Sequence, residues 1–442
     1  MSKMLGQRLL VCACLLSGAH ASVSTAQVGP GGGSPGANPV VEWNQILLTI
    51  VRTPGVQPAT VHPTRSFAIM HAAIYDAVNA IDGRFAPYAV APRGVPTNAS
   101  QPAAAATAAH DVLVALYPSL TASLDARLAE SLSSIPDNAA KTAGIEVGRD
   151  VAARMLALRR NDESAAPPVP YTFGDRAGDY QSTPPNFPQP AFTHWRYVDP
   201  FVLQNEDRFH LNGPPPLETQ RYGEALEEVK AAGVTNGARS TADEAVTGRF
   251  WNGPIQNYWN EIAQTVSRSQ NLSLSDTARL FALLDLTIAD CVITFYDAKY
   301  TYNFWRPVTA VRAAANDTNA ATAADPNWLP QSGNSPADPS YPGAHAVVAS
   351  ASATVLKAFF NGDDVAFDVT SETLPGVTRS FNQFSAAMRE ASLSRIFAGV
   401  HYRFDEDDGE QLGSDVAKLA IARLFHERRN DRVPRGLGPR RE

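Results

Sequence analysis

The chain has 442 residues, of which 44% are hydrophobic and 18% are charged, and this fits one large or two ordinary globular domains. The formal net charge of −7 gives no reason to expect nucleic-acid binding, which normally shows as a basic patch or stripe. It still allows a local basic pocket for anions.

The N-terminus has the features of an export signal. Lys3 and Arg8 lie before a short apolar run at 9–16, and candidate cleavage sites with small residues follow that run. This pattern predicts a signal peptide over 1–26, followed by a flexible Gly/Pro-rich leader over 27–40. The apolar run is too short to span a bilayer, and no later stretch reaches the ~18 apolar residues that a membrane helix needs. We therefore expect an exported, periplasmic or secreted protein with no transmembrane segment in its mature chain.

Most of the remaining sequence has helical periodicity. Apolar residues recur at spacings of three and four from Phe67 to Ile81, as one buried helical face requires. Further helices are expected at about 101–117, 120–133, 137–160, 217–232, 255–268 and 273–303. Apolar and polar residues seldom alternate, which argues against a substantial β-sheet. The sequence therefore predicts an all-α fold of stacked helical bundles.

The chain divides into an N-terminal helical region over 41–235 and a C-terminal helical region over 236–442. Within the first, residues 165–216 are rich in proline, with no sustained period. A segment this long without regular structure is uncommon inside a domain and is often functional. Two interpretations remain open, a lid over a site or an irregular surface connection.

The first segment that suggests chemistry contains Lys299 and Arg306. They are seven residues apart, two helical turns, so both project from one face if the helix at 273–303 extends that far. Pro307 marks the expected end of the helix. Because the segment is aromatic and apolar, two cations on one face would repel unless an anion lay between them. The alternative is an exposed pair whose charged ends reach solvent.

The second segment is Tyr341-Pro-Gly-Ala-His345, directly before an apolar helix expected over 346–360. Proline followed by small residues at a helix start leaves backbone N–H groups free at the positive end of the dipole, which binds oxyanions. Gly343 and Ala344 allow a ligand to approach the backbone, and His345 is placed to exchange a proton with it. The alternative is a plain Pro-Gly turn that caps a core helix.

The third segment contains Arg395 and His401, six residues apart across a glycine. An acidic cluster at 405–408 follows, at the start of a last helix expected over about 406–427. Asp405 can accept a hydrogen bond from one ring nitrogen of His401, which would fix its tautomer and free the other nitrogen. The alternative makes Asp405 only a helix N-cap, and both roles can coexist.

The three segments together favour an oxyanion site in the C-terminal half. Lys299, Arg306 and Arg395 supply three positive charges, and guanidinium groups suit tetrahedral oxyanions because they bind in a bidentate manner. Each unit-charge pair at ~4 Å is worth about 4 kcal/mol at an effective dielectric near 20. Three cations can therefore hold a vanadate or phosphate anion that no neutral pocket would retain.

The order K-x6-RP, P-[SG]-x-H and SR-x3-GxH-x3-D resembles the vanadium-dependent haloperoxidases and the related type 2 phosphatidic-acid phosphatases over residues 270–427. Trp43-Asn44 and the helix HAAIYDAVNAIDG that begins at His71 are similar to the bacterial haloperoxidase branch. The resemblance implies two stacked helical bundles with the site at their centre. It also implies a vanadate cofactor, with phosphate competing for the same site.

The resemblance implies a role for each matching residue. The residues that would bind the anion are Lys299, Arg306, Arg395 and, through their backbone amides, Gly343 and Ala344. His345 would act as the acid–base group, and Lys299 would also polarise the substrate peroxide. His401, oriented by Asp405, would be the axial vanadium ligand in a peroxidase or the nucleophile in a phosphatase. One position departs from the family, which usually has serine and then glycine where this chain has Gly343 and Ala344. The missing hydroxyl removes a hydrogen bond worth ~1.5–3 kcal/mol if charge-assisted.

Three functional hypotheses follow. The first is a vanadate-dependent peroxidase that oxidises a halide or a small organic donor with hydrogen peroxide. The second is a soluble phosphomonoesterase in which His401 attacks phosphorus to form a phosphohistidine. The third is a non-catalytic oxyanion-binding member of the family, motivated by the missing serine.

Overall fold

A computed structural model describes residues 38–204, 207, 209, 211–234 and 241–427. Within them the chain forms thirteen α-helices and one two-stranded antiparallel sheet. The predicted all-α class is confirmed, with this small sheet as an addition. The expected signal peptide (1–26) and most of the leader (27–40) lie outside the described residues, and the first described helix begins at Pro39.

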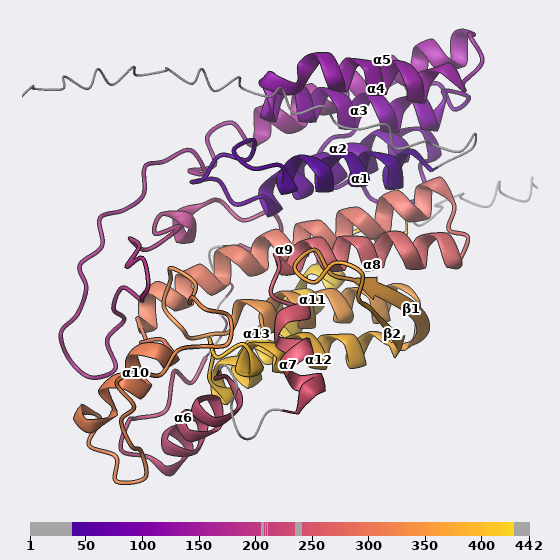
Figure 1. Ribbon diagram of the computed structural model, residues 1–442. Coiled ribbons are helices and arrows are strands. Elements are labelled where there is room, and N and C mark those ends of the chain that lie inside the picture. Colours follow the sequence, from indigo (N-terminus) through magenta and orange to yellow (C-terminus); the bar gives the residue numbers. More distant parts are fainter. Residues whose placement is uncertain (1–37, 205–206, 208, 210, 235–240, 428–442) are drawn as a thin grey trace, which may run out of the picture.

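Five helices form the N-terminal bundle, shown in indigo and purple in Figure 1. They are α1 (Pro39–Arg52), α2 (Thr64–Asp82), α3 (Gln101–Leu116), α4 (Thr121–Ser133) and α5 (Ala139–Leu158), with a 3₁₀ turn at Pro118–Leu120. Side chains of Asn38, Ser100 and Asn138 accept hydrogen bonds from the first turns of α1, α3 and α5, as N-caps do. The alanine-rich α3 packs between α2 and α5, because small buried side chains allow helices to approach closely.

The described part of residues 165–216 is largely irregular, as expected, and runs between the two bundles (Figure 1). Their described part contains one 3₁₀ turn at Trp195–Tyr197. The backbone N–H groups of 201–203 donate to the buried Asp290 carboxylate, at 2.6–2.8 Å. Asp179 also forms a β-bridge with Phe304. The segment is therefore attached to the C-terminal bundle at several points.

The C-terminal region contains the remaining helices. They are α6 (Gln220–Ala232), α7 (Ala242–Phe250), α8 (Ile255–Ser269), α9 (Leu274–Tyr302), α10 (Pro307–Ala313), α11 (Ala344–Phe359), α12 (Phe384–Phe397) and α13 (Arg403–Arg423), with a 3₁₀ turn at Ala314–Asn316. The 29-residue α9 is buried along most of its length. It packs against α2 on one side and against α11 and α13 on the other, so it is the core helix shared by the two bundles (Figure 1). None of the described helices is long and apolar enough to cross a membrane.

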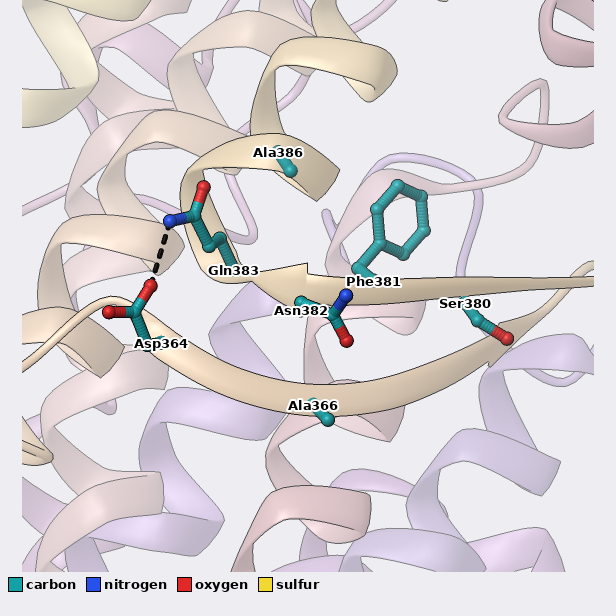
Figure 2. A pocket seen from close by; sticks show the side chains of 7 residues that line it. All are labelled: Asp364, Ala366, Ser380, Phe381, Asn382, Gln383 and Ala386. Atoms are coloured by element: carbon teal, nitrogen blue, oxygen red, sulfur yellow. Dashed lines mark hydrogen bonds between the residues drawn. The ribbon is translucent and has the colours of Figure 1, made fainter.

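The small sheet joins β1 (Asp364–Thr370) to β2 (Thr378–Gln383), with Phe367 opposite Phe381. A surface hollow of about 640 Å³ lies beside this hairpin, and Figure 2 shows the side chains that line it. Its lining consists of Asp364, Ala366, Ser380, Phe381, Asn382, Gln383 and Ala386. Because this lining includes no cation, the hollow does not have the chemistry of an oxyanion site.

A buried polar cluster lies where the two bundles meet. It consists of Asn44, His71, Asn260 and Asp285, each at most 1% exposed. His71 Nε2 lies 3.0 Å from Asn44 Oδ1, and Asn260 donates to Asp285 Oδ1 at 2.9 Å. Burial raises the pKa of Asp285 to about 8 and lowers the pKa of His71 to about 3, so both side chains are neutral at pH 7.

The cluster predicts a pH-dependent stability. The folded-state pKa of Asp285, about 8, lies above its ordinary value of 3.8, so its contribution to the free energy of unfolding declines as the pH rises between these values. Asp285→Asn should remove this decline and gain stability relative to the wild type from pH 5 to pH 8, measured by urea denaturation. Asp415→Asn, at an exposed ion pair with Lys418, is the control. Parallel pH profiles for the wild type and Asp285→Asn would contradict the assignment.

Candidate oxyanion site

The cations and histidines singled out in the sequence converge where five helices begin or end. Lys299 lies in the last turn of α9 and Arg306 is the N-cap of α10. His345 is in the first turn of α11, Arg395 is in the last turn of α12, and His401 precedes the N-cap of α13. All but the partly buried His345 are at most 3% exposed. The alternative that Lys299 and Arg306 are an exposed surface pair is therefore wrong.

Lys299 and Arg306 do not share one helix face, contrary to the expectation from their spacing. Helix α9 ends at Tyr302, because Asn303 adopts a left-handed conformation (φ 55°) and terminates it. Arg306 therefore belongs to the next helix. The two cations meet through a carboxylate: Asp338 Oδ1 lies 3.4 Å from Lys299 Nζ and also accepts a hydrogen bond from Arg306.

Asp338 is the counter-charge of this pair. Burial opposes its ionisation, but Lys299 and Arg306 outweigh that effect and hold the pKa of Asp338 below its ordinary value. Burial lowers the pKa of Lys299 to about 8, although Asp338 limits the decrease. Lys299 Nζ also donates to the carbonyls of Pro339 and Ser340, at 2.6 and 3.0 Å. The cation pair is thus stable in the fold without an external anion.

His401 is held in one tautomer. Its Nδ1 lies 2.9 Å from Asp405 Oδ2, and burial followed by the charges of Arg306 and Lys299 lowers the pKa of His401 well below its ordinary value. The imidazole is therefore neutral, with its proton on Nδ1 facing the carboxylate. Its Nε2 lone pair faces Arg306, whose Nη1 lies 3.1 Å away.

Asp405 orients His401 and also stabilises the start of α13. It occupies the third residue of the helix rather than the N-cap, which is Tyr402. Its Oδ2 accepts hydrogen bonds from the Tyr402 N–H at 3.1 Å and from Ser340 Oγ at 2.6 Å. Asp405 is therefore not the N-cap that one alternative expected; it binds the Tyr402 N–H from the third position of α13 and also orients His401.

His345 is anchored by the loop between α7 and α8. Its Nε2 lies 3.0 Å from the Trp251 carbonyl and 3.1 Å from the Gly253 carbonyl. Two carbonyl acceptors require a proton on Nε2, so Nδ1 is the nitrogen left to accept a proton. Burial and the nearby Arg395 lower the pKa of His345 well below its ordinary value, and the ring is neutral.

Arg395 is incompletely paired. One guanidinium nitrogen donates to Asn252 Oδ1 at 3.0 Å, but Nε has no hydrogen-bond partner among the described residues. Burial lowers the pKa of Arg395 to about 10, an effect that Glu406 opposes. A buried guanidinium with an unused donor is suited to an anionic ligand.

The two backbone amides expected in the anion cradle differ. The Gly343 N–H donates to the Asp405 carbonyl at 2.9 Å, so it is not available to a ligand, and that expectation is wrong. The Ala344 N–H donates to no described residue. It lies in the first turn of α11, where the helix dipole favours an anion.

Sequence reasoning missed four polar residues of the site: Asp338, Ser340, Asn252 and Glu406. Asp338 and Ser340 directly precede the Tyr341-Pro342 motif, and two cations expected in an apolar environment require a nearby carboxylate. This requirement could have identified Asp338 from the sequence. Asn252 comes from a distant loop, and no local pattern identifies it. Glu406 lies in the acidic cluster at 405–408, and the sequence alone does not show which of these acidic residues faces the site.

Comparisons with known proteins agree with this geometry. Residues 279–429 match the family model described as the VCPO second helical-bundle domain. The chain is 28% identical over 352 residues to a vanadium chloroperoxidase from Curvularia inaequalis, covering 60% of this chain and 57% of that protein. It is also 28% identical over 290 residues to a vanadium-dependent bromoperoxidase from Ascophyllum nodosum, covering 59% and 50%. The chain thus matches about half the length of these relatives.

Solved structures extend the comparison to nearly the whole fold. A bacterial vanadium-dependent iodoperoxidase superimposes with a TM-score of 0.72 at 24% identity, over 88% of this chain and 95% of that one. An apo-type bacterial vanadium-dependent chloroperoxidase gives 0.65 at 14% identity, over 83% and 93%. At these identities the likeness concerns the fold. Together with the family model, it confirms the resemblance to the vanadium haloperoxidase superfamily.

The shared carboxylate leads to a testable prediction. Asp338→Asn leaves Lys299 and Arg306 without a counter-charge, so the free energy of unfolding in anion-free buffer should fall by about 3–5 kcal/mol, the cost of breaking a buried pair. Inorganic phosphate should then stabilise the variant more than the wild type, because the anion becomes the only compensating charge. Denaturant unfolding with and without phosphate measures both effects. Asp243→Asn, at a surface ion pair with Arg379, is the control, and equal stabilisation of all three proteins by phosphate would refute the prediction.

Proposed function

We propose that this chain, which has the fold of the vanadium haloperoxidases and their second helical-bundle domain, is a vanadate-dependent peroxidase that oxidises a halide or a similar donor with hydrogen peroxide. The observation that carries the proposal is the state of His401. It is a neutral buried imidazole with Nδ1 bound to Asp405 and the Nε2 lone pair directed toward a cation. Such a nitrogen is a metal ligand whose tautomer is already set.

The residues present fit a bound vanadate anion. Lys299, Arg306 and Arg395 supply three positive charges, which the carboxylates of Asp338 and Asp405 offset only in part. Arg395 has an unused Nε donor, and the Ala344 amide is free in the first turn of a helix. His401 would hold the metal, and the three cations would hold the oxygens. When bound, vanadate supplies activation of hydrogen peroxide toward two-electron oxidation of a donor.

The chain's own residues would position and protonate the reactants. Asp405 keeps the proton of His401 on Nδ1, so that Nε2 remains a lone-pair donor. His345, fixed through Nε2, would accept a proton from hydrogen peroxide at Nδ1 and return it to the leaving oxygen. Lys299 would polarise the substrate peroxide through its positive charge.

The site lies in a protein for which we also propose export. The basis is the N-terminal pattern over residues 1–26: two basic residues, a short apolar run and small-residue cleavage sites. Hydrogen peroxide and a halide or small organic donor would then be taken from the periplasm or the medium.

His401→Ala should abolish vanadate-dependent halogenation. The test uses protein stripped of phosphate and measures bromide- and peroxide-dependent halogenation of a dione reporter, with and without orthovanadate. Wild-type protein should halogenate only with vanadate, while His401→Ala should neither halogenate nor retain vanadium after dialysis, because the ligand nitrogen is gone. His426→Ala changes an exposed histidine near the end of α13 and serves as the control.

Three outcomes would contradict the proposal. Stoichiometric vanadium retained by His401→Ala would reject the ligand assignment. A folded wild-type protein that is silent with vanadate but hydrolyses a phosphomonoester, with a trapped phosphohistidine at His401, would identify a phosphatase instead. Binding of vanadate or phosphate with neither activity would identify a non-catalytic binding protein.

Asp405→Ala should weaken vanadate binding without abolishing it. Loss of a hydrogen-bond partner to a ligating histidine typically lowers metal affinity by about 10- to 100-fold, and here it also frees the His401 ring to change tautomer. Equilibrium dialysis against orthovanadate measures the dissociation constant. Asp408→Ala, three residues later and bound to the Tyr341 hydroxyl, should bind vanadate like the wild type. Equal affinities for wild type and Asp405→Ala would show that the hydrogen bond does not matter for binding.

A further inference from the structure

Gly343 stands where the resembling family usually has serine, and the structure shows what fills the space. A Cβ atom built on Gly343 would lie 2.3 Å from Glu406 Oε1 and 2.7 Å from the carboxyl carbon. These distances are shorter than real Cβ contacts. A serine at position 343 would therefore require the Glu406 carboxyl group to shift from its observed position.

Glu406 cannot easily move away. It is 1% exposed and lies in the first turn of α13. That helix packs so closely on α11 that a Cβ on Gly413 would lie 2.0 Å from the Val347 carbonyl oxygen. Ser392 Oγ donates to the other carboxyl oxygen, Oε2, at 3.3 Å, so the carboxyl group is held on that side.

The oxygen that faces Gly343 is unused. Glu406 Oε1 has no hydrogen-bond partner among the described residues. It lies 3.8 Å from His401 Nδ1, but that nitrogen already donates to Asp405. An unsatisfied buried polar atom destabilises the fold, and more so when it is charged. This oxygen and the unused Nε of Arg395 are both buried beside the oxyanion site, and both require a partner that the chain does not provide.

We propose that Glu406 replaces the family's serine and binds the oxyanion directly, through one hydrogen bond between Oε1 and an anion oxygen. This inference rests on the proposed function, because it requires an oxyanion in the site. The proton of that bond belongs either to the carboxyl group or to the anion. In both cases Glu406 favours an anion whose oxygen can share a proton with the carboxyl group, as protonated phosphate and vanadate can.

The test is a substitution cycle at the two positions, with inorganic phosphate and orthovanadate as probes. Glu406→Ala should weaken phosphate binding about 10- to 100-fold, the equivalent of one charge-assisted hydrogen bond. Glu406→Gln should lose less affinity, because its amide can still donate to the anion. Adding Gly343→Ser to Glu406→Ala should recover affinity, since the serine hydroxyl then has room. Gly343→Ser alone should lower the melting temperature through the close contact with Glu406.

The readouts are the dissociation constant by titration calorimetry and the melting temperature of each variant. Glu410→Ala, one turn further along α13 and bound to Arg389, is the matched control and should bind phosphate like the wild type. Recovery by the double variant distinguishes a ligand-binding role from a structural one, because a structural loss at Glu406 would not be repaired by a serine on α11.

Several results would overturn the inference. Unchanged or tighter phosphate binding by Glu406→Ala, with wild-type protein that binds, would mean that the carboxyl group makes no favourable contact; the proposed function would stand. A double variant no better than Glu406→Ala would reject the exchange of serine for glutamate. Wild-type protein that binds neither phosphate nor vanadate would overturn the proposed function and this inference together.

Discussion

Two cations buried close together in a mainly apolar interior repel strongly unless a negative group lies between them. In this protein Asp338 supplies that group to Lys299 and Arg306, which come from the end of one helix and the start of another. Because the carboxylate bonds to both, it fixes the turn between α9 and α10 relative to the loop before α11. The rest of the site is assembled around these three side chains.

The shared carboxylate also explains how a net positive site is stable without its anion. Arg306 donates to Asp338 and faces the free nitrogen of His401, while Lys299 donates to two backbone carbonyls. A ligand must compete with these contacts, so part of its binding energy replaces existing hydrogen bonds. Arg395 differs, because its Nε has no partner among the described residues. This guanidinium is the cation most ready to receive an anion.

Helix α9 connects the two halves of the protein to this chemistry. Its buried length packs against α2 of the N-terminal bundle and against α11 and α13, which carry His345 and Glu406. The neutral cluster of His71 and Asp285 lies in the same interface. None of the three cations of the site comes from the N-terminal bundle, yet that bundle supports the helix whose last turn carries Lys299.

The sequence alone determined the helical class, most helix positions and the residue types that bind an oxyanion. These depend on local periodicity and on short motifs whose spacing is visible in one segment. Tertiary structure decided how the charges are compensated, because Asp338 lies 39 positions after Lys299 in the sequence. It also decided which groups remain available to a ligand. The Gly343 amide donates to the Asp405 carbonyl, and the Glu406 carboxyl occupies the space beside Gly343. Long-range electrostatics and excluded volume act between segments that only the fold brings together, so no local pattern encodes them.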